Sequence, residues 1–151
     1  SSHDYSERIE TIKRAKKAGL EVCSGGILGM GESWRDRIEM ALLLKELEVD
    51  SVPMNFLVPI KGTPLEDVPA IDPLDAVRSI AVFRMITEGI DIKVVAGRET
   101  VLRDLQGMMY SAGANGMMVG GYLTITGRSV EEDRALIEEI KRSWSEELIN
   151  C

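Results

Sequence analysis

The sequence predicts an α/β fold, the C-terminal half of a (β/α)8 TIM-type barrel, on three observations. Short apolar runs alternate with longer amphipathic segments, in the order helix and then strand and helix four times over. Glycine or proline follows each apolar run, and the first helix has no strand before it. Such alternation indicates a parallel sheet with right-handed crossovers, and four units are half of a barrel of about 250 residues. An open four-stranded sheet is the alternative, which composition leaves open.

The expected strands are the apolar runs themselves, which cover residues 21–24, 51–58, 90–96 and 116–119. Runs of this length, bounded by turn residues, are typical of strands. The first run leads into the glycine-rich stretch CSGGILGMGE, whose glycines let the backbone turn sharply or lie against a ligand. The second run leads into a long loop that contains several prolines.

The expected helices are the amphipathic segments, which cover residues 5–18, 33–48, 73–87, 100–111 and 130–147. Ser33 with Asp36, and Ser129 with Glu132, form capping boxes that start the second and the last of them. Pro73 stands near the first position of the third, where its missing N–H costs no hydrogen bond. In the second helix, the apolar residues expected to face the core are Ile38, Ala41, Leu42, Leu44 and Leu47.

Length and composition restrict the class of protein. A chain of 151 residues suits a single domain, residues 1–151, with a sizeable core. The formal net charge of −7 argues against a nucleic acid or an anionic membrane as partner. No apolar stretch reaches the roughly 18 residues of a membrane span, and the polar N-terminus is unlike a signal peptide. Because the two cysteines form no disulfide framework, we expect a cytoplasmic protein.

Polar side chains near the strand ends are the candidates for a functional site. Cys23 is expected at the C-terminal tip of a strand, where α/β folds keep their sites, although a lone cysteine in an apolar run is more often a buried small hydrophobe. Asn55, on an apolar strand, must be hydrogen-bonded, either within the fold or to a ligand. Lys93 is expected to extend its charge to solvent or to be paired. For Arg98 and Glu99 a structural ion pair is favoured.

Four motifs carry a resemblance to a known family. They are CSGGILGMGES, VPMNFLVPIKGTPL, AGRE and SAGANGMMVGGYLTITG, and they fall in this order at the four expected strand ends. Together they resemble the C-terminal half of the biotin synthase family, which belongs to the radical S-adenosylmethionine superfamily and is built on a (β/α)8 barrel. The likeness extends over residues 5–141. It implies the same half-barrel that the alternation of strands and helices predicts.

The resemblance implies iron–sulfur chemistry at two residues. Cys23 matches a thiolate ligand of the family's auxiliary 2Fe–2S cluster, which is regarded as the sulfur source. The family's usual arginine ligand falls at Lys93, and a protonated ammonium cannot ligate iron, so the resemblance implies a variant cluster or a changed fourth ligand. The C-x-x-x-C-x-x-C run that binds the family's radical-generating 4Fe–4S cluster is absent from this chain.

The resemblance also implies positions for cofactor and substrate. Ile27, Met30 and Val58 match residues that contact the adenosyl group of S-adenosylmethionine. Asn55 matches an amide that hydrogen-bonds dethiobiotin, and Thr124 matches a threonine at the substrate's tail.

The implied function is that of a sulfurtransferase of the radical class, which inserts sulfur into dethiobiotin to form biotin in the intact enzyme. We expect this chain alone to be inactive. The implied partners are a small electron-transfer protein as reductant and a second subunit in a homodimer. Alternatives are a hydrogenase-maturation or pyrrolysine-pathway enzyme of the same barrel subfamily, and a non-catalytic α/β module that holds a nucleotide on its glycine loops.

Overall fold

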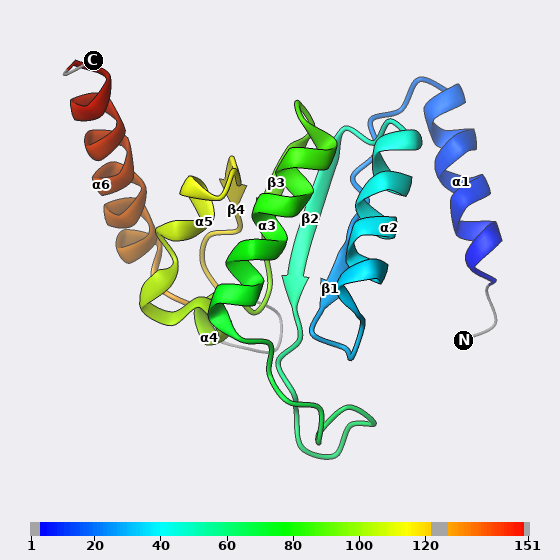
Figure 1. Ribbon diagram of the computed structural model, residues 1–151, viewed down its shortest axis with the longest axis horizontal. Coiled ribbons are helices and arrows are strands. Elements are labelled where there is room, and N and C mark those ends of the chain that lie inside the picture. The colour runs from blue at the N-terminus through cyan, green and yellow to red at the C-terminus, as the bar shows by residue number, and fades with distance from the viewer. Residues whose placement is uncertain (1–3, 122–126, 150–151) are drawn as a thin grey trace.

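A computed structural model describes residues 4–121 and 127–149, which form one sheet with helices alternating between its strands (Figure 1). The strands lie side by side in chain order and every neighbouring pair is parallel. They are β1 (Gly26–Leu28), β2 (Ser51–Phe56), β3 (Asp91–Val94) and β4 (Gly116–Met117). The helices are α1 (Tyr5–Lys17), α2 (Trp34–Glu46), α3 (Pro73–Thr87), α4 (Arg98–Leu102), the 3-10 turn η1 (Arg103–Leu105), α5 (Met108–Ser111) and α6 (Val130–Ile149). The predicted α/β class with four parallel strands is confirmed, and the arrangement is consistent with half of a barrel.

The first strand lies further along the chain than the sequence predicts. We expected residues 21–24, but there only Cys23 pairs, in a single parallel bridge with Ser51, and β1 is formed by the glycine-rich stretch itself. The glycine-rich stretch can lie beside β2 because it lacks side chains: a Cβ placed on Gly25 would lie 2.1 Å from the carbonyl oxygen of Pro53. Glycine within a strand often marks such an approach, which apolar periodicity does not reveal.

The helix expected over residues 100–111 is three short pieces. α4 ends at Leu102, and Arg103 then takes a φ of +50°, in the left-handed region that interrupts a helix. The turn η1 and the one-turn helix α5 follow. The two predicted capping boxes are present: Ser33 and Asp36 exchange hydrogen bonds, and so do Ser129 and Glu132.

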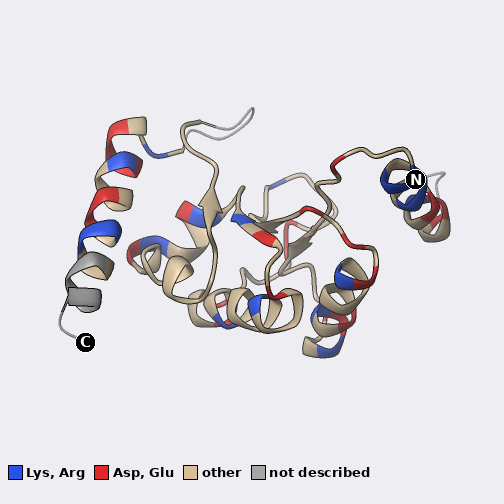
Figure 2. Ribbon diagram, turned by 90° about the horizontal axis from the view of Figure 1, so that it is seen from above, with Lys and Arg blue, Asp and Glu red and all other residues tan. Residues whose placement is uncertain are grey.

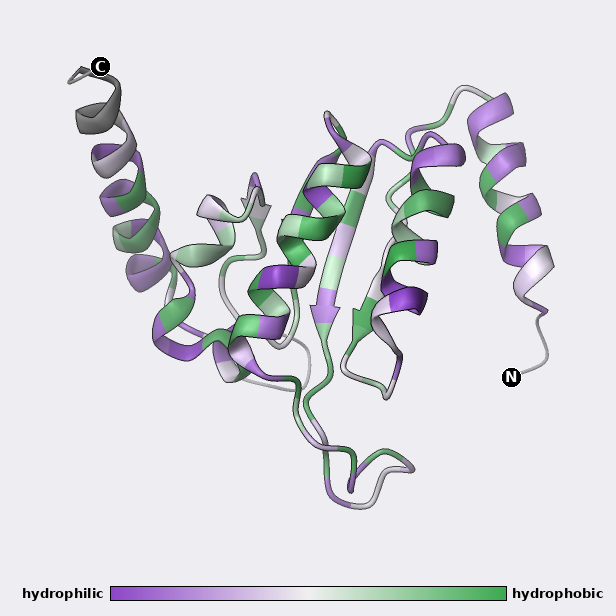
Figure 3. Ribbon diagram, viewed as in Figure 1, coloured by the Kyte–Doolittle hydropathy of each residue, from purple (hydrophilic) through white to green (hydrophobic). Residues whose placement is uncertain are grey.

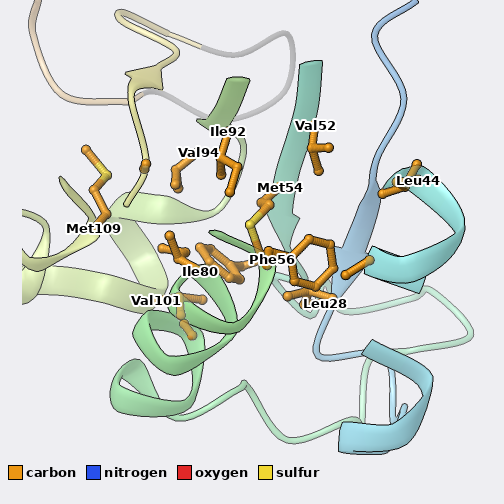
Figure 4. Packing of buried hydrophobic residues seen from close by; sticks show 14 of the residues in the cluster. Leu28, Leu44, Val52, Met54, Phe56, Ile80, Ile92, Val94, Val101 and Met109 are labelled. Atoms are coloured by element: carbon orange, nitrogen blue, oxygen red, sulfur yellow. The ribbon is translucent and has the colours of Figure 1, made fainter. Parts of the chain in front are cut away.

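The core lies between one face of the sheet and helices α2 and α3. Alternate strand residues point to this face, including Val52, Met54, Phe56, Ile92 and Val94, and they belong to the same buried cluster as Ile80 of α3 and Leu44 of α2 (Figure 4). Figure 3 shows the resulting alternation of apolar and polar residues along the ribbons of the strands and helices. Burial of this apolar surface is the main favourable contribution to folding.

Two core assignments on α2 were wrong. Ala41, Leu44 and Leu47 are buried as predicted, but Ile38 is 39% and Leu42 is 52% exposed. Among the described helices only α3 is in extensive contact with α2, so the apolar stripe on α2 is wider than the surface that its neighbours bury. Helices α1 and α6 stand at the two ends of the molecule (Figure 1), and acidic and basic residues are interspersed along both of them (Figure 2). No helix among the described residues is both long and apolar enough to cross a bilayer.

Candidate functional site

Strand register brings four of the predicted site residues to the same face of the sheet. Ile27 pairs with Asn55, Cys23 with Ser51, and Pro53 with Lys93. Because side chains alternate along a strand and paired residues point the same way, the side chains of Cys23, Ile27, Asn55 and Lys93 all leave the face opposite the core. We call this the uncovered face: Ile27 is 49% exposed there, and Cys23 and Lys93 are exposed as well.

Cys23 lies at a different depth from the one predicted. The sequence placed it at the C-terminal tip of the first strand, whereas its partner Ser51 is the first residue of β2. Cys23 precedes Ile27 by four residues, which is about 13 Å along an extended chain. The candidate site is therefore a strip that runs down the uncovered face, with Cys23 at its deep end and the carboxyl ends of the strands at its mouth.

The middle of this strip has a single long side chain. Pro53, Lys93 and Gly116 occupy one row across β2, β3 and β4, and Gly25, the residue before β1, lies against Pro53. The Lys93 side chain lies over Gly116, since a Cβ placed there would be 3.1 Å from Lys93 Cγ. Within residues 4–121 and 127–149 no ion pair of Lys93 is found. In this row Lys93 is thus the only residue with a long side chain, and its ammonium group is exposed.

The amide of Asn55 connects three segments of the fold. Its Nδ2 donates to the carbonyl oxygen of Gly26 at 3.3 Å, and its Oδ1 accepts from the backbone N–H of Ala96 at 3.1 Å. This confirms the interpretation of Asn55 as a satisfied partner within the sheet. A primary amide has two N–H donors and two acceptor lone pairs, so one of each is left for a ligand on the uncovered face. The ligand role stays a prediction.

The loop after β1 is held in shape by Glu32. Its carboxylate accepts from the backbone N–H groups of Gly29 at 2.9 Å and Met30 at 2.8 Å, and pairs with Arg37 at 2.7 Å. Arg37 is itself buried and donates to Ser79 Oγ of α3 at 3.1 Å. Burial would raise the pKa of Glu32, but the hydrogen bonds from Gly29, Arg37 and Met30 outweigh it and hold the pKa below its usual range.

This loop presents the residues predicted to meet an adenosyl group. Met30 is 47% exposed at its tip, and Val58 follows the end of β2, where the N–H of Leu57 donates to the carbonyl oxygen of Leu28 at 2.8 Å. Both residues lie at the mouth of the strip, beyond Ile27. The sequence did not indicate Glu32 or Arg37, although a carboxylate three residues after a glycine is the kind of signal that could have done so.

The AGRE motif has a structural role. Arg98 is fully buried and pairs with Glu99 at 3.1 Å, which confirms the predicted ion pair. It also pairs with Asp133 of α6 at 2.5 Å and donates to Gln106. The partnership with Asp133 spans 35 residues, and no local pattern in the sequence could have indicated it. The predicted substrate residue Thr124 lies outside the described residues.

The described residues supply one soft metal ligand to this face. No group of three or more potential ligand side chains occurs among them, and Cys23 is a free, exposed thiol. A thiolate is the usual donor to iron–sulfur clusters, so Cys23 fits one position of such a cluster. Lys93 does not fit a second, because a protonated ammonium has no lone pair to offer.

The chain is similar to one protein family over most of its length. The Biotin and Thiamin Synthesis associated domain matches residues 53–142, from β2 to α6. The biotin synthase of Endomicrobium trichonymphae is 55% identical over 140 residues, which are 93% of this chain and 44% of that protein. The biotin synthase of Thermotoga neapolitana is 54% identical over 142 residues, 93% of this chain and 50% of that one.

The biotin synthase of Pelotomaculum thermopropionicum is 53% identical over 143 residues, which are 95% of this chain and 44% of that protein. The chain therefore spans about half the length of the curated relatives that it matches, and it corresponds to their C-terminal half.

Proposed function

Because the chain belongs to the family of the Biotin and Thiamin Synthesis associated domain, we propose that it is the C-terminal half of a biotin synthase, which inserts sulfur into dethiobiotin. The observation that carries the proposal is that the strand register places Cys23, Ile27, Asn55 and Lys93 on one face of the sheet. These residues lie in the part of the chain that matches the biotin synthases named above. The active protein would be a soluble cytoplasmic enzyme that also needs the preceding half.

Each residue of the strip has a role that suits its chemistry. Met30 and Val58 at the mouth, and Ile27 just inside it, offer apolar surface, which suits the adenosyl group of S-adenosylmethionine. The free N–H and lone pair of Asn55 suit the ureido ring of dethiobiotin, which carries both a carbonyl oxygen and N–H groups. Thr124 would meet the tail of the substrate.

Cys23, at the deep end, would give its thiolate to an auxiliary iron–sulfur cluster. When bound, S-adenosylmethionine with a 4Fe–4S cluster supplies the radical chemistry, and the auxiliary cluster supplies sulfur. The described residues fit that auxiliary cluster through one ligand only, so either a 2Fe–2S cluster with another fourth ligand or a variant cluster is proposed. The ammonium of Lys93 would balance the negative charge of the cluster instead of ligating iron. The ligands of the 4Fe–4S cluster would come from the preceding half, a small electron-transfer protein would act as reductant, and the intact enzyme would be a homodimer.

The test joins this chain to the preceding half of one of the biotin synthases named above. The joined protein, with reconstituted clusters, should convert dethiobiotin to biotin in the presence of S-adenosylmethionine and a reductant, whereas the 151-residue chain alone should form none. A joined protein that binds its 4Fe–4S cluster and cleaves S-adenosylmethionine, yet forms no biotin, would contradict the proposal.

A matched pair of cysteine variants tests the assignment of Cys23. In the joined protein, Cys23→Ser should lose the iron and sulfide of the auxiliary cluster and keep the 4Fe–4S cluster, because a hydroxyl binds iron much less well than a thiolate. Cys151→Ser, at the end of the chain, is the control and should lose neither. Equal auxiliary iron in the wild type and Cys23→Ser would remove Cys23 from the site.

A further inference from the structure

Two side chains bind the backbone of the residues that immediately precede Cys23 and Lys93 on the uncovered face. Asp50, the residue before β2, accepts from the N–H of Val22 through Oδ2 at 2.6 Å, and its own N–H donates to the carbonyl oxygen of Val22 at 2.9 Å. These two bonds close a ring between Asp50 and Val22, the residue before Cys23. Lys16 of α1 pairs with the same carboxylate at 2.9 Å.

Asn115 repeats this arrangement at the other side of the sheet. Its Oδ1 accepts from the N–H of Ile92 at 2.7 Å, and its own N–H donates to the carbonyl oxygen of Ile92 at 3.0 Å. Ile92 is the residue before Lys93, and Asn115 is the residue before β4. The Nδ2 of Asn115 donates to Asp91 at 2.6 Å, which fixes the orientation of the amide.

Both rings stand where the backbone ladder is short. The described β3·β4 ladder has only the pairs at Lys93 and Val94, and the β1·β2 ladder begins only at Gly26, beyond the lone bridge at Cys23. In a sheet, a slip of one residue turns every side chain to the opposite face. Such a slip would point the Cys23 thiol and the Lys93 ammonium toward the core side. The hydrogen bonds from the N–H of Val22 to Asp50 and from the N–H of Ile92 to Asn115 oppose this slip directly beside Cys23 and Lys93.

We propose that Asp50 and Asn115 are positioning residues that hold Cys23 and Lys93 at a fixed depth on the uncovered face, so that a single auxiliary cluster meets both. The Cα atoms of these two residues are separated by two strand spacings and two residues along the strand, on the order of 12 Å. A cluster of a few ångströms between them contacts both side chains only if both strands keep their register. This inference rests on the proposed function, which assigns the cluster to Cys23.

The experiment measures how firmly the joined protein holds its auxiliary iron. The readouts are the chelator concentration that removes half of that iron and the visible absorption of the auxiliary cluster, with the 4Fe–4S cluster as internal reference. Residues that hold a metal ligand in place typically contribute about 10- to 100-fold to metal affinity. Asp50→Ala and Asn115→Ala should each lower the chelator concentration by about 10-fold or more on that ground.

Two further variants separate the ring from its surroundings. Asp50→Asn keeps an oxygen that can accept from Val22, and Lys16→Met removes the ion pair while leaving the Val22 bond, so both should stay close to the wild type. Amide exchange at Val22 and Ile92 should accelerate only in the matching alanine variant. If an alanine variant does not fold, Asp50→Gln, whose longer side chain cannot close the ring without moving Val22, should lower the chelator concentration in its place.

Each outcome has a distinct meaning. Wild-type resistance to chelator and unchanged cluster absorption in Asp50→Ala and Asn115→Ala, or in Asp50→Gln, would overturn the inference and leave the proposed function intact. A loss in Lys16→Met as large as that in Asp50→Ala would also overturn it, because the ion pair alone would then explain the effect. If the wild-type joined protein holds no iron that depends on Cys23, the proposed function itself fails.

Discussion

Asn55 can both hold the sheet together and bind a ligand. Its amide makes hydrogen bonds to Gly26 of β1 and to Ala96 after β3. One donor and one acceptor of the amide are left, and they face away from the core. Because both fold contacts fix the plane of the amide, a ligand would meet a donor and an acceptor in a set orientation. Preorganised polar groups of this kind favour binding, since no side chain needs to be ordered when the ligand arrives.

Substitution of Asn55 should therefore lower the stability of the chain itself. In Asn55→Ala, the N–H of Ala96 and the carbonyl oxygen of Gly26 lose their partner, which we expect to cost about 1–3 kcal/mol of unfolding free energy. Asn55→Asp keeps the acceptor for Ala96 but turns a second carboxylate oxygen toward the carbonyl oxygen of Gly26, so it should not restore the wild-type stability. Urea denaturation followed by circular dichroism checks both values. An Asn55→Ala variant as stable as the wild type would mean that these two hydrogen bonds contribute nothing.

The position of β1 depends on the approach of a neighbouring strand, and Gly25 makes that approach possible. A Cβ at Gly25 would meet the Pro53 carbonyl at 2.1 Å, so Gly25→Ala should separate β1 from β2. Overpacking of this kind costs about 1–3 kcal/mol, and a clash with backbone should reach the upper end. Gly89→Ala is the matched control, because nothing lies within 4 Å of its added Cβ and its φ is not positive. The difference in urea midpoint between the two variants is the measurement, and equal midpoints would contradict the close approach.

The loop between β1 and α2 should respond to acid through Glu32. The pKa of this carboxyl is lowered in the folded chain from an ordinary value of 4.5. A carboxyl with a depressed folded pKa adds stability above its unfolded pKa, and that stability is lost as the pH falls through the folded value. Glu32→Gln should consequently show a smaller decrease in unfolding free energy than the wild type between neutral pH and about pH 3. The check is urea denaturation at both pH values; an equal decrease in the two proteins would mean that Glu32 does not hold the loop.

Local signals in the sequence predicted most of these elements, and long-range contacts explain the errors. The capping residues Ser33 and Ser129 mark helix starts because their bonds reach only three residues along the chain. The site residues share a face as a consequence of alternation, although the depth of Cys23 was wrong. That depth follows from the pairing of Cys23 with Ser51, almost thirty positions away, and the support of Arg98 by Asp133 depends on α6 folding back. Such pairings have no periodic signal.

The described sheet has two outer strands, β1 and β4. Among the described residues no strand pairs with the outer side of β1 or of β4. Next to β4 lies an apolar cavity of about 650 Å³. Its lining includes Tyr110, Ala114, Met117, Ile137, Ile140 and Trp144. The relatives are about twice as long as this chain, so in them a further half of the protein is available to cover such surfaces.

The isolated chain should therefore associate with itself, whereas the joined protein should not do so through these strands. Unpaired strand edges and an apolar cavity both favour contacts between copies. Light scattering of the chain should give a mass above 16.7 kDa that rises with concentration. The amides of Gly26–Leu28 and Gly116–Met117 should exchange faster than those of β2 and β3, which are paired on both sides.

Joining the preceding half should slow exchange at both outer strands together, since a closed barrel covers both edges at once. A concentration-independent monomer with strong protection at both outer strands would show that the sheet is complete in itself, and the half-barrel interpretation would then be wrong.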